Sequence, residues 1–121
     1  YKKTFLKNNL VFTSSGNKKS RYIVIEFAKL MQDKGAGEII LQSITRDGTM
    51  EGYDLDVIKE ISSNLEIPVV ALGGAGKLKD LQLAFRESKA SALAAGSLFI
   101  YQSKLRGVLI NYPEKSELKE I

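Results

Sequence analysis

The sequence predicts an α/β fold whose strands run parallel to one another. Short apolar runs alternate with longer stretches in which apolar residues recur every three or four positions, in the order β, α, β, α, β, α, β, α. Each pair spans roughly 25 to 30 residues, the size of one βα unit, and such units are joined by right-handed crossovers. Four of them form either a small open sheet or half of an eight-stranded barrel, and the pattern alone leaves both open.

The first unit is a short strand followed by an amphipathic helix. Residues 10–15 predict the strand, which ends at a glycine and a polar turn. Residues 21–34 predict the helix, with Ser20 as its N-cap and Gly35 as its stop. The apolar residues on one face of this helix are Ile23, Phe27, Leu30 and Met31.

The second and third units repeat this pattern. Residues 38–44 form a nearly continuous apolar run, which is typical of a strand buried on both faces. Asp54 is placed to cap a helix that carries Leu55, Ile58, Ile61 and Leu65 on one face. Residues 68–73 predict the next strand, and residues 77–88 predict the helix that follows it.

The last unit has a weaker pattern. Residues 90–95 predict a strand, and a helix is expected from about Ser97. Residues 113–121 predict one further short helix. The chain has 121 residues, of which 44% are hydrophobic and 26% charged, and no linker or low-complexity segment interrupts it. We therefore expect residues 1–121 to form one domain.

The composition excludes several kinds of site. The chain has no cysteine and no histidine, so disulfides and thiolate or imidazole metal sites are impossible. Acid–base chemistry then falls to Asp, Glu, Lys or Tyr. We expect no metal and no cofactor, and the absence of cysteine fits a reducing, cytoplasmic location.

Charge and hydropathy argue against two classes of partner. The formal net charge is +4, but the Lys and Arg residues are scattered, so we expect no nucleic acid partner. The longest uncharged stretch, residues 90–103, is too short to span a bilayer. The amino terminus lacks the long apolar region of a signal peptide. We therefore expect no membrane association.

Three glycine-containing loops follow the carboxyl ends of predicted strands. They are TRDGT (45–49), GGAG (73–76) and AAGS (94–97). Ligands bind at this end of the strands in α/β folds. The pair Gly73–Gly74 lets backbone N–H groups approach a phosphate closely, and the last loop precedes a predicted helix, whose N-terminus favours an anion.

Each loop also has an ordinary interpretation. GGAG by itself is most often a turn, a serine before a helix is most often a cap, and Asp47 alone is typical of an Asx turn. Their occurrence at the ends of consecutive strands predicts a site for a phosphorylated substrate. Glu38 lies at the opposite end of its strand, where an exposed strand start is the ordinary interpretation.

The motifs in their order resemble a known family. GAGEIILQSITRDGTMEGYDLDVIKEIS, followed by IPVVALGGAG, resembles the cyclase subunit of imidazole glycerol phosphate synthase, and VFTSSGNKKS and AAGSLF extend the resemblance over nearly the whole chain. That family is a (βα)8 TIM-type barrel that works with a glutaminase subunit. Ammonia passes through the barrel to a phosphorylated substrate at its C-terminal face. The resemblance implies that this chain is the C-terminal half-barrel.

The resemblance also implies roles for single residues. Asp47 matches the family's auxiliary catalytic carboxylate, and Gly48 and Thr49 belong to the same substrate loop. Glu38 matches a charged residue that gates the entry of ammonia at the opposite face. The residues that match loops holding a substrate phosphate are Gly73, Gly74, Gly96 and Ser97.

Some positions depart from the family pattern. Thr45 replaces the first aspartate of SIDRDGT, Leu72 replaces the serine of ASGGAG, and Gln42 stands where a small hydroxyl residue is common. The stretch AAGSLFIYQSKLRGVLINYP resembles specialised paralogues encoded with surface-polysaccharide genes, the glycosyl amidation-associated proteins. That resemblance implies delivery of ammonia from the glutaminase partner to a sugar-modifying amidotransferase in lipopolysaccharide O-antigen synthesis.

The resemblance sets limits on activity and assembly. The family's two principal catalytic aspartates lie on the first and fifth strands, and this chain begins at Tyr1, just after the second of them. We therefore expect no cyclase activity from this polypeptide alone. A half-barrel exposes apolar sheet edges, so we expect half-barrels to self-associate. The alternative function is a non-catalytic phosphate-binding or self-assembling module.

Overall fold

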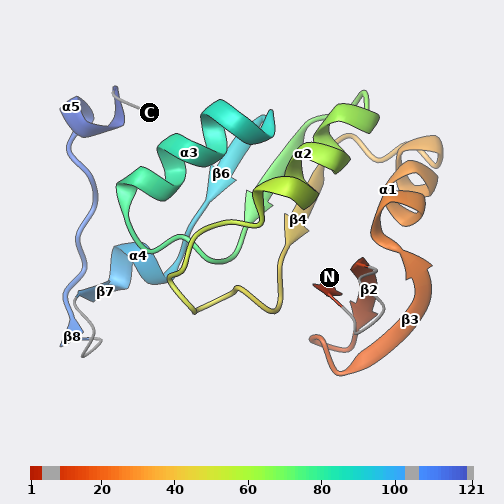
Figure 1. Cartoon of the computed structure of the whole chain (residues 1–121), viewed down its shortest axis with the longest axis horizontal. Coiled ribbons are helices and arrows are strands. Elements are labelled where there is room, and N and C mark those ends of the chain that lie inside the picture. The colour runs from red at the N-terminus through yellow and green to blue at the C-terminus, as the bar shows by residue number, and fades with distance from the viewer. Residues whose placement is uncertain (4–8, 103–106, 120–121) are drawn as a thin grey trace.

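A parallel sheet lies at the centre of the fold. The computed structural model describes residues 1–3, 9–102 and 107–119. The sheet consists of β4 (Ile39–Gln42), β5 (Val69–Leu72) and β6 (Ala92–Ala94), in that spatial order (Figure 1). The predicted parallel α/β fold is confirmed for these three strands, whose predicted bounds were longer: 38–44, 68–73 and 90–95.

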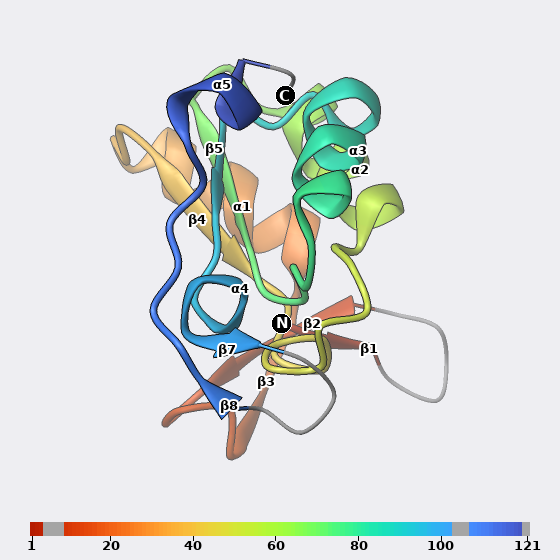
Figure 2. The same ribbon diagram turned by 90° about the vertical axis from the view of Figure 1, so that its left-hand side faces the viewer.

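Three helices cover one face of this sheet. They are α1 (Val24–Asp33), α2 (Leu55–Asn64) and α3 (Leu78–Ser88), and each contacts the next. Figure 2 shows α2 and α3 together on one side of the strands. Along β4, Leu41 is buried under the helices, whereas Ile40 is 66% exposed. Side chains alternate between the faces of a strand, so the second face of the sheet is left uncovered.

The expected first strand is present, but the prediction that it runs parallel to the other strands was wrong. It is β2 (Asn9–Thr13), which pairs antiparallel with β1 (Lys2–Lys3) and β3 (Lys18–Ile23) in a separate sheet. The turn residues Ser14, Ser15 and Gly16 all have positive φ, and they send the chain straight back. A turn this short joins only antiparallel strands, because a parallel pair needs a crossover of a dozen residues or more.

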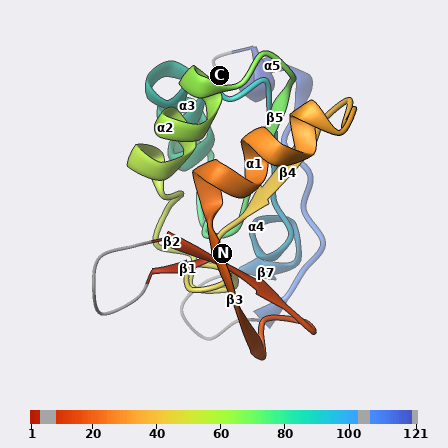
Figure 3. The same cartoon turned by 90° about the vertical axis from the view of Figure 1, so that its right-hand side faces the viewer.

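Because of the hairpin, the first helix begins later in the sequence than predicted. Figure 3 shows α1 rising directly from β3, which takes up the residues expected to begin the helix. The N-cap is therefore Ile23, and not the predicted Ser20. The predicted stop at Gly35 is confirmed: its N–H donates to Gln32 O, and the N–H of Ala36 donates to Met31 O. Gly35 has φ +92°, as the residue after a helix C-cap commonly does.

The carboxyl-terminal part is less regular than expected. The helix predicted from Ser97 is a single turn, α4 (Ser97–Ile100), followed by β7 (Tyr101–Gln102) and β8 (Gly107–Val108), which pair antiparallel. The predicted last helix, 113–121, is α5 (Lys115–Leu118), and its residues 120–121 lie outside the described part. Among the described residues, no helix is long and apolar enough to cross a membrane.

The core lies between the sheet and its helices. Ile61 of α2 is 1% exposed, and it belongs to the same buried cluster as Val69 and Ala71 of β5. Burial of such side chains supplies most of the free energy that holds α2 on the sheet.

Replacing Ile61 with alanine should lower the free energy of unfolding by about 2–5 kcal/mol, because it removes buried methyl groups and leaves a cavity. Ile110 is 82% exposed, so the same change at Ile110 is the matched control and should cost no more than about 0.5 kcal/mol. Urea denaturation followed by circular dichroism measures both. Equal losses would contradict this position of the core.

Candidate functional site

Three loops meet at the carboxyl edge of the parallel sheet. The strands pair in register, with Gln42 opposite Leu72 and Leu72 opposite Ala94, so all three strands end at one level. The loop residues that follow line one small cavity of about 10 Å³. From the predicted site it includes Asp47, Gly48, Gly73, Gly74, Gly96 and Ser97. The structure thus brings together residues that are up to 50 positions apart in sequence.

Glycines allow these loops to touch through their backbones. Gly73 and Gly74 have φ +99° and +108°, a region that side chains disfavour. A Cβ atom at Gly74 would overlap the carbonyl group of Gly52, and one at Gly73 would lie 2.8 Å from Ser43 O. The N–H of Gly52 donates to Gly74 O at 2.8 Å. The GGAG loop is therefore held against the segment that follows TRDGT.

Asp47 presents its carboxylate at the end of β4. Its Oδ2 accepts a hydrogen bond of 2.8 Å from Nε2 of Gln42, and both side chains are exposed. The backbone N–H of Asp47 donates to Ser43 O at 2.9 Å, which fixes the turn. The Gln42 amide therefore orients the Asp47 carboxylate through Oδ2, and Oδ1 of Asp47 is not used in this bond. Position 42 is one of those that depart from the family pattern.

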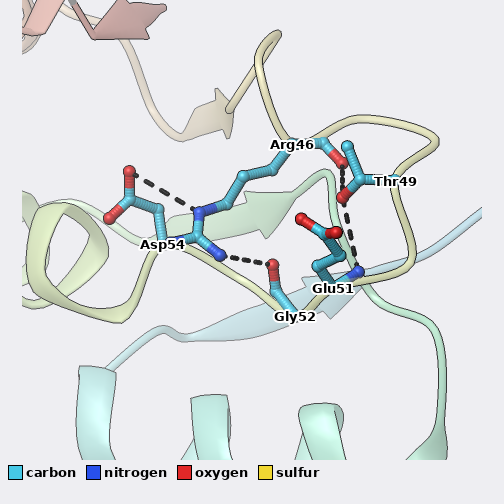
Figure 4. Close-up of polar contacts among 5 residues, drawn as sticks. All are labelled: Arg46, Thr49, Glu51, Gly52 and Asp54. Atoms are coloured by element: carbon cyan, nitrogen blue, oxygen red, sulfur yellow. Dashed lines mark hydrogen bonds and ion pairs between the residues drawn. The ribbon is translucent and has the colours of Figure 1, made fainter.

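The structure does not place Thr49 in the glycine-lined cavity. Its hydroxyl donates to Arg46 O at 2.8 Å and accepts a bond of 3.3 Å from the N–H of Glu51 (Figure 4). Arg46 in turn donates to Gly52 O at 3.2 Å, and its Nε lies 4.0 Å from Oδ2 of Asp54. Thr49 lines a separate polar cavity of about 330 Å³. A role for Thr49 in phosphate binding remains a prediction.

Asp54 occupies the N-cap position of α2, as predicted, but it makes no capping hydrogen bond with its side chain. The carboxylate is instead directed toward Arg46, as Figure 4 shows. This ion pair joins the β4–α2 loop to the start of α2. It is partly exposed, so it contributes more to orientation than to stability.

Tyr53 is a residue that the sequence analysis quoted in a motif but gave no role. It is 4% exposed, and its hydroxyl donates to Ala94 O at 2.8 Å across the edge of the sheet. Burial, together with the negative charge of Asp80, raises the pKa of Tyr53 to about 12. The phenol therefore stays protonated and able to donate at neutral pH. A tyrosine between a glycine and a helix N-cap, at the end of the loop that follows β4, was the available signal.

Glu38 lies at the other end of the sheet. It is exposed and directly precedes β4, away from the cavity that the loops line. This agrees with the opposite-face position expected for it, while its gating role remains a prediction. Within the described ranges, no group of three or more carboxylates could hold a metal ion.

Comparison with known proteins gives a consistent result. The model of the family described as "Histidine biosynthesis protein" matches residues 3–106. The chain is 44% identical over 109 residues to "Putative imidazole glycerol phosphate synthase subunit hisF3" of Vibrio vulnificus, and 41% identical over 117 residues to "Putative imidazole glycerol phosphate synthase subunit hisF2" of Pseudomonas aeruginosa. It is 48% identical over 93 residues to "Imidazole glycerol phosphate synthase subunit HisF" of Pelodictyon phaeoclathratiforme.

The extent of these matches differs between the relatives. They cover 90%, 97% and 77% of this chain, respectively, but only 42%, 47% and 37% of the relatives. The chain therefore spans less than half the length of the curated relatives that it matches.

Replacing Gly74 with alanine should cost about 1–3 kcal/mol, because the new Cβ atom would overlap the Gly52 carbonyl at a strained φ. The same change at Gly37, where a Cβ atom meets nothing within 4 Å, should cost no more than about 0.5 kcal/mol. Thermal unfolding of both variants measures the difference. A stable Gly74→Ala protein would show that the two loops are not interlocked as described.

Proposed function

The chain belongs to the histidine biosynthesis protein family, and from this premise we propose that it forms the phosphate-binding part of a cyclase subunit of the imidazole glycerol phosphate synthase type. One observation carries the proposal. A carboxylate and two glycine-rich loops converge on one cavity at the carboxyl ends of three parallel strands. This is the end of the sheet at which α/β proteins bind their ligands.

The phosphate of the substrate would be held by backbone N–H groups. Gly73 and Gly74 line the cavity and have no side chains to separate their N–H groups from a ligand, and Gly96 and Ser97 line it from the start of α4. The enclosed space of about 10 Å³ holds about one water molecule, so a phosphate group would lie across its opening. Oriented N–H dipoles bind an anion there without needing a positively charged side chain.

Asp47 would supply the acid–base group on this side of the substrate. Its carboxylate borders the same cavity, and Gln42 orients it. In the complete barrel, ammonia from a glutaminase subunit would reach this face and react with the bound intermediate. Asp47 would accept or return protons during ring closure, and Glu38, at the far end of β4, would gate the entry of ammonia.

We further propose that the chain belongs to the branch that serves amidation of a surface-polysaccharide sugar. The matches to the hisF3 and hisF2 relatives cover 90% and 97% of the chain, against 77% for the Pelodictyon relative. Gln42 and Leu72, both departures from the usual cyclase pattern, end adjacent strands beside the proposed site. These features favour a changed acceptor together with a retained phosphate loop.

Inorganic phosphate should bind the 121-residue chain and shift the amide resonances of Gly73, Gly74, Gly96 and Ser97. A Gly96→Asp substitution should weaken this binding at least about tenfold, because it places a negative charge beside the anion. Gly96 has open space around a Cβ atom, so the variant should fold. NMR titration with phosphate, at fixed ionic strength, measures the dissociation constants.

The control is the same substitution at Gly37, which has equally open surroundings and lies beyond the opposite end of β4. Gly37→Asp should bind phosphate as the unmodified chain does. If phosphate does not bind, or if both variants lose affinity equally, the proposed phosphate site is wrong.

Self-association is the second property that we propose for the chain. The uncovered face of the sheet carries Ile40, which is 66% exposed, and an apolar cavity of about 230 Å³ lies between β4, α1 and β2. Exposed apolar surface of this kind is typical of an interface.

Sedimentation velocity at micromolar concentrations should therefore show dimers or larger species. Ile40→Glu should shift them toward monomer, because a charge on the buried side of an interface is costly to desolvate. Ile110→Glu, at a residue that is 82% exposed and belongs to no strand of the parallel sheet, is the matched control. A monomer at all concentrations would refute self-association through this face.

A further inference from the structure

Two walls of the glycine-lined cavity are attached to the same pair of residues. The N–H of Gly52 donates to Gly74 O at 2.8 Å, and the hydroxyl of the next residue, Tyr53, donates to Ala94 O at 2.8 Å. Gly74 belongs to the loop after β5, and Ala94 ends β6. The segment Gly52–Tyr53 therefore spans both loops that would hold a phosphate.

The loop after β6 has little else to position it. β6 has three residues and pairs only with β5 among the described strands, and α4 has four residues. Elements this short gain little stability from their own hydrogen bonds. Ala94 is followed directly by Ala95, Gly96 and Ser97, which line the cavity. A bond that fixes the carbonyl of Ala94 therefore fixes the point from which these residues start.

Tyr53 is well placed to supply that bond. Its side chain belongs to the main hydrophobic cluster, so the ring is held in one position. A buried hydroxyl is costly to leave without a partner, and the Ala94 carbonyl is the acceptor that this one finds. The other end of the GGAG loop is held separately, since the carboxylate of Asp80 accepts from the N–H groups of Gly76 and Lys77.

We propose that Tyr53 is a positioning residue for the anion site, and that its hydroxyl holds the β6–α4 loop at the separation from Gly73–Gly74 that phosphate binding requires. This inference rests on the proposed function of the same cavity. It assigns the ring of Tyr53 to the core and the hydroxyl to the site. These two contributions can be separated by a single substitution.

Tyr53→Phe keeps the ring and removes only the hydroxyl. We expect the dissociation constant for inorganic phosphate to rise about tenfold, since the loss of one such bond amounts to roughly 1.4 kcal/mol. Amide shifts on phosphate addition should be lost at Gly96 and Ser97 and kept at Gly73 and Gly74. Tyr22→Phe is the matched control, because its hydroxyl accepts an exposed bond from the neighbouring Arg21 and not one from the site, and it should bind phosphate normally.

A second measurement does not depend on phosphate. The N–H of Phe99 donates to Gly96 O, so its hydrogen exchange reports on the order of the β6–α4 loop. In free Tyr53→Phe this exchange should accelerate severalfold while that of the N–H of Ile58 in α2 stays unchanged. If the unmodified chain fails to bind phosphate, the proposed function is wrong, and faster exchange at Phe99 would still support the positioning role.

Two results would overturn the inference. One is a Tyr53→Phe protein whose phosphate affinity and Phe99 exchange both equal those of the unmodified chain. The other is exchange that accelerates equally at Phe99 and Ile58, with phosphate affinity of the folded protein unchanged. In that case the hydroxyl supports the fold as a whole and has no particular relation to the site.

Discussion

The in-register pairing of β4, β5 and β6 is the constraint on which the site depends. Parallel strands in register end at one level, so the loops after them begin side by side. The helices α2 and α3 fix this arrangement because their apolar faces cover the same side of the sheet. With strands and helices placed, only backbone without side chains can fill the remaining space, and Gly74 meets that requirement against Gly52. Close packing of the scaffold thus brings glycine backbone, without side chains, to the edge where we propose that an anion binds.

The periodicity of the sequence predicted the main helices and the parallel strands. It predicted less well the strand directions and loop paths that short turns determine. The three helices were predicted because each has buried residues at helical spacing, and β4, β5 and β6 were predicted because each is a short apolar run. The direction of β2 was wrong, because Ser14 and Ser15 adopt positive φ values that serines rarely take. Convergence of the glycine loops followed from strand order. The separation of Thr49 from them did not, since it results from the path of a single loop around Arg46.

The role of Tyr53 illustrates why a motif alone is insufficient. Its acceptor, Ala94, is 41 residues further along the chain, and no local pattern indicates that pairing. Gln42 is a similar case, because its contact with Asp47 depends on how the chain turns after β4. Both bonds join side chains to groups beyond their own strand or helix. The Tyr53 contact becomes visible only when distant segments are placed next to one another in space, and the Gln42 contact only when the path of the turn is known.

The two ends of β4 show how stability and chemistry are divided. At its amino-terminal end, Gly35 and Gly37 lie in open surroundings, and Glu38 is exposed to solvent. At its carboxyl end, Gly73, Gly74 and Gly76 each lie so close to neighbouring backbone that a side chain would collide. Tight backbone contact orders the N–H groups before any ligand arrives, which reduces the entropic cost of binding. The crowding that makes Gly73, Gly74 and Gly76 intolerant of substitution would therefore also keep this loop in place for the proposed anion, whereas Gly48 and Gly96 at the same edge have open surroundings.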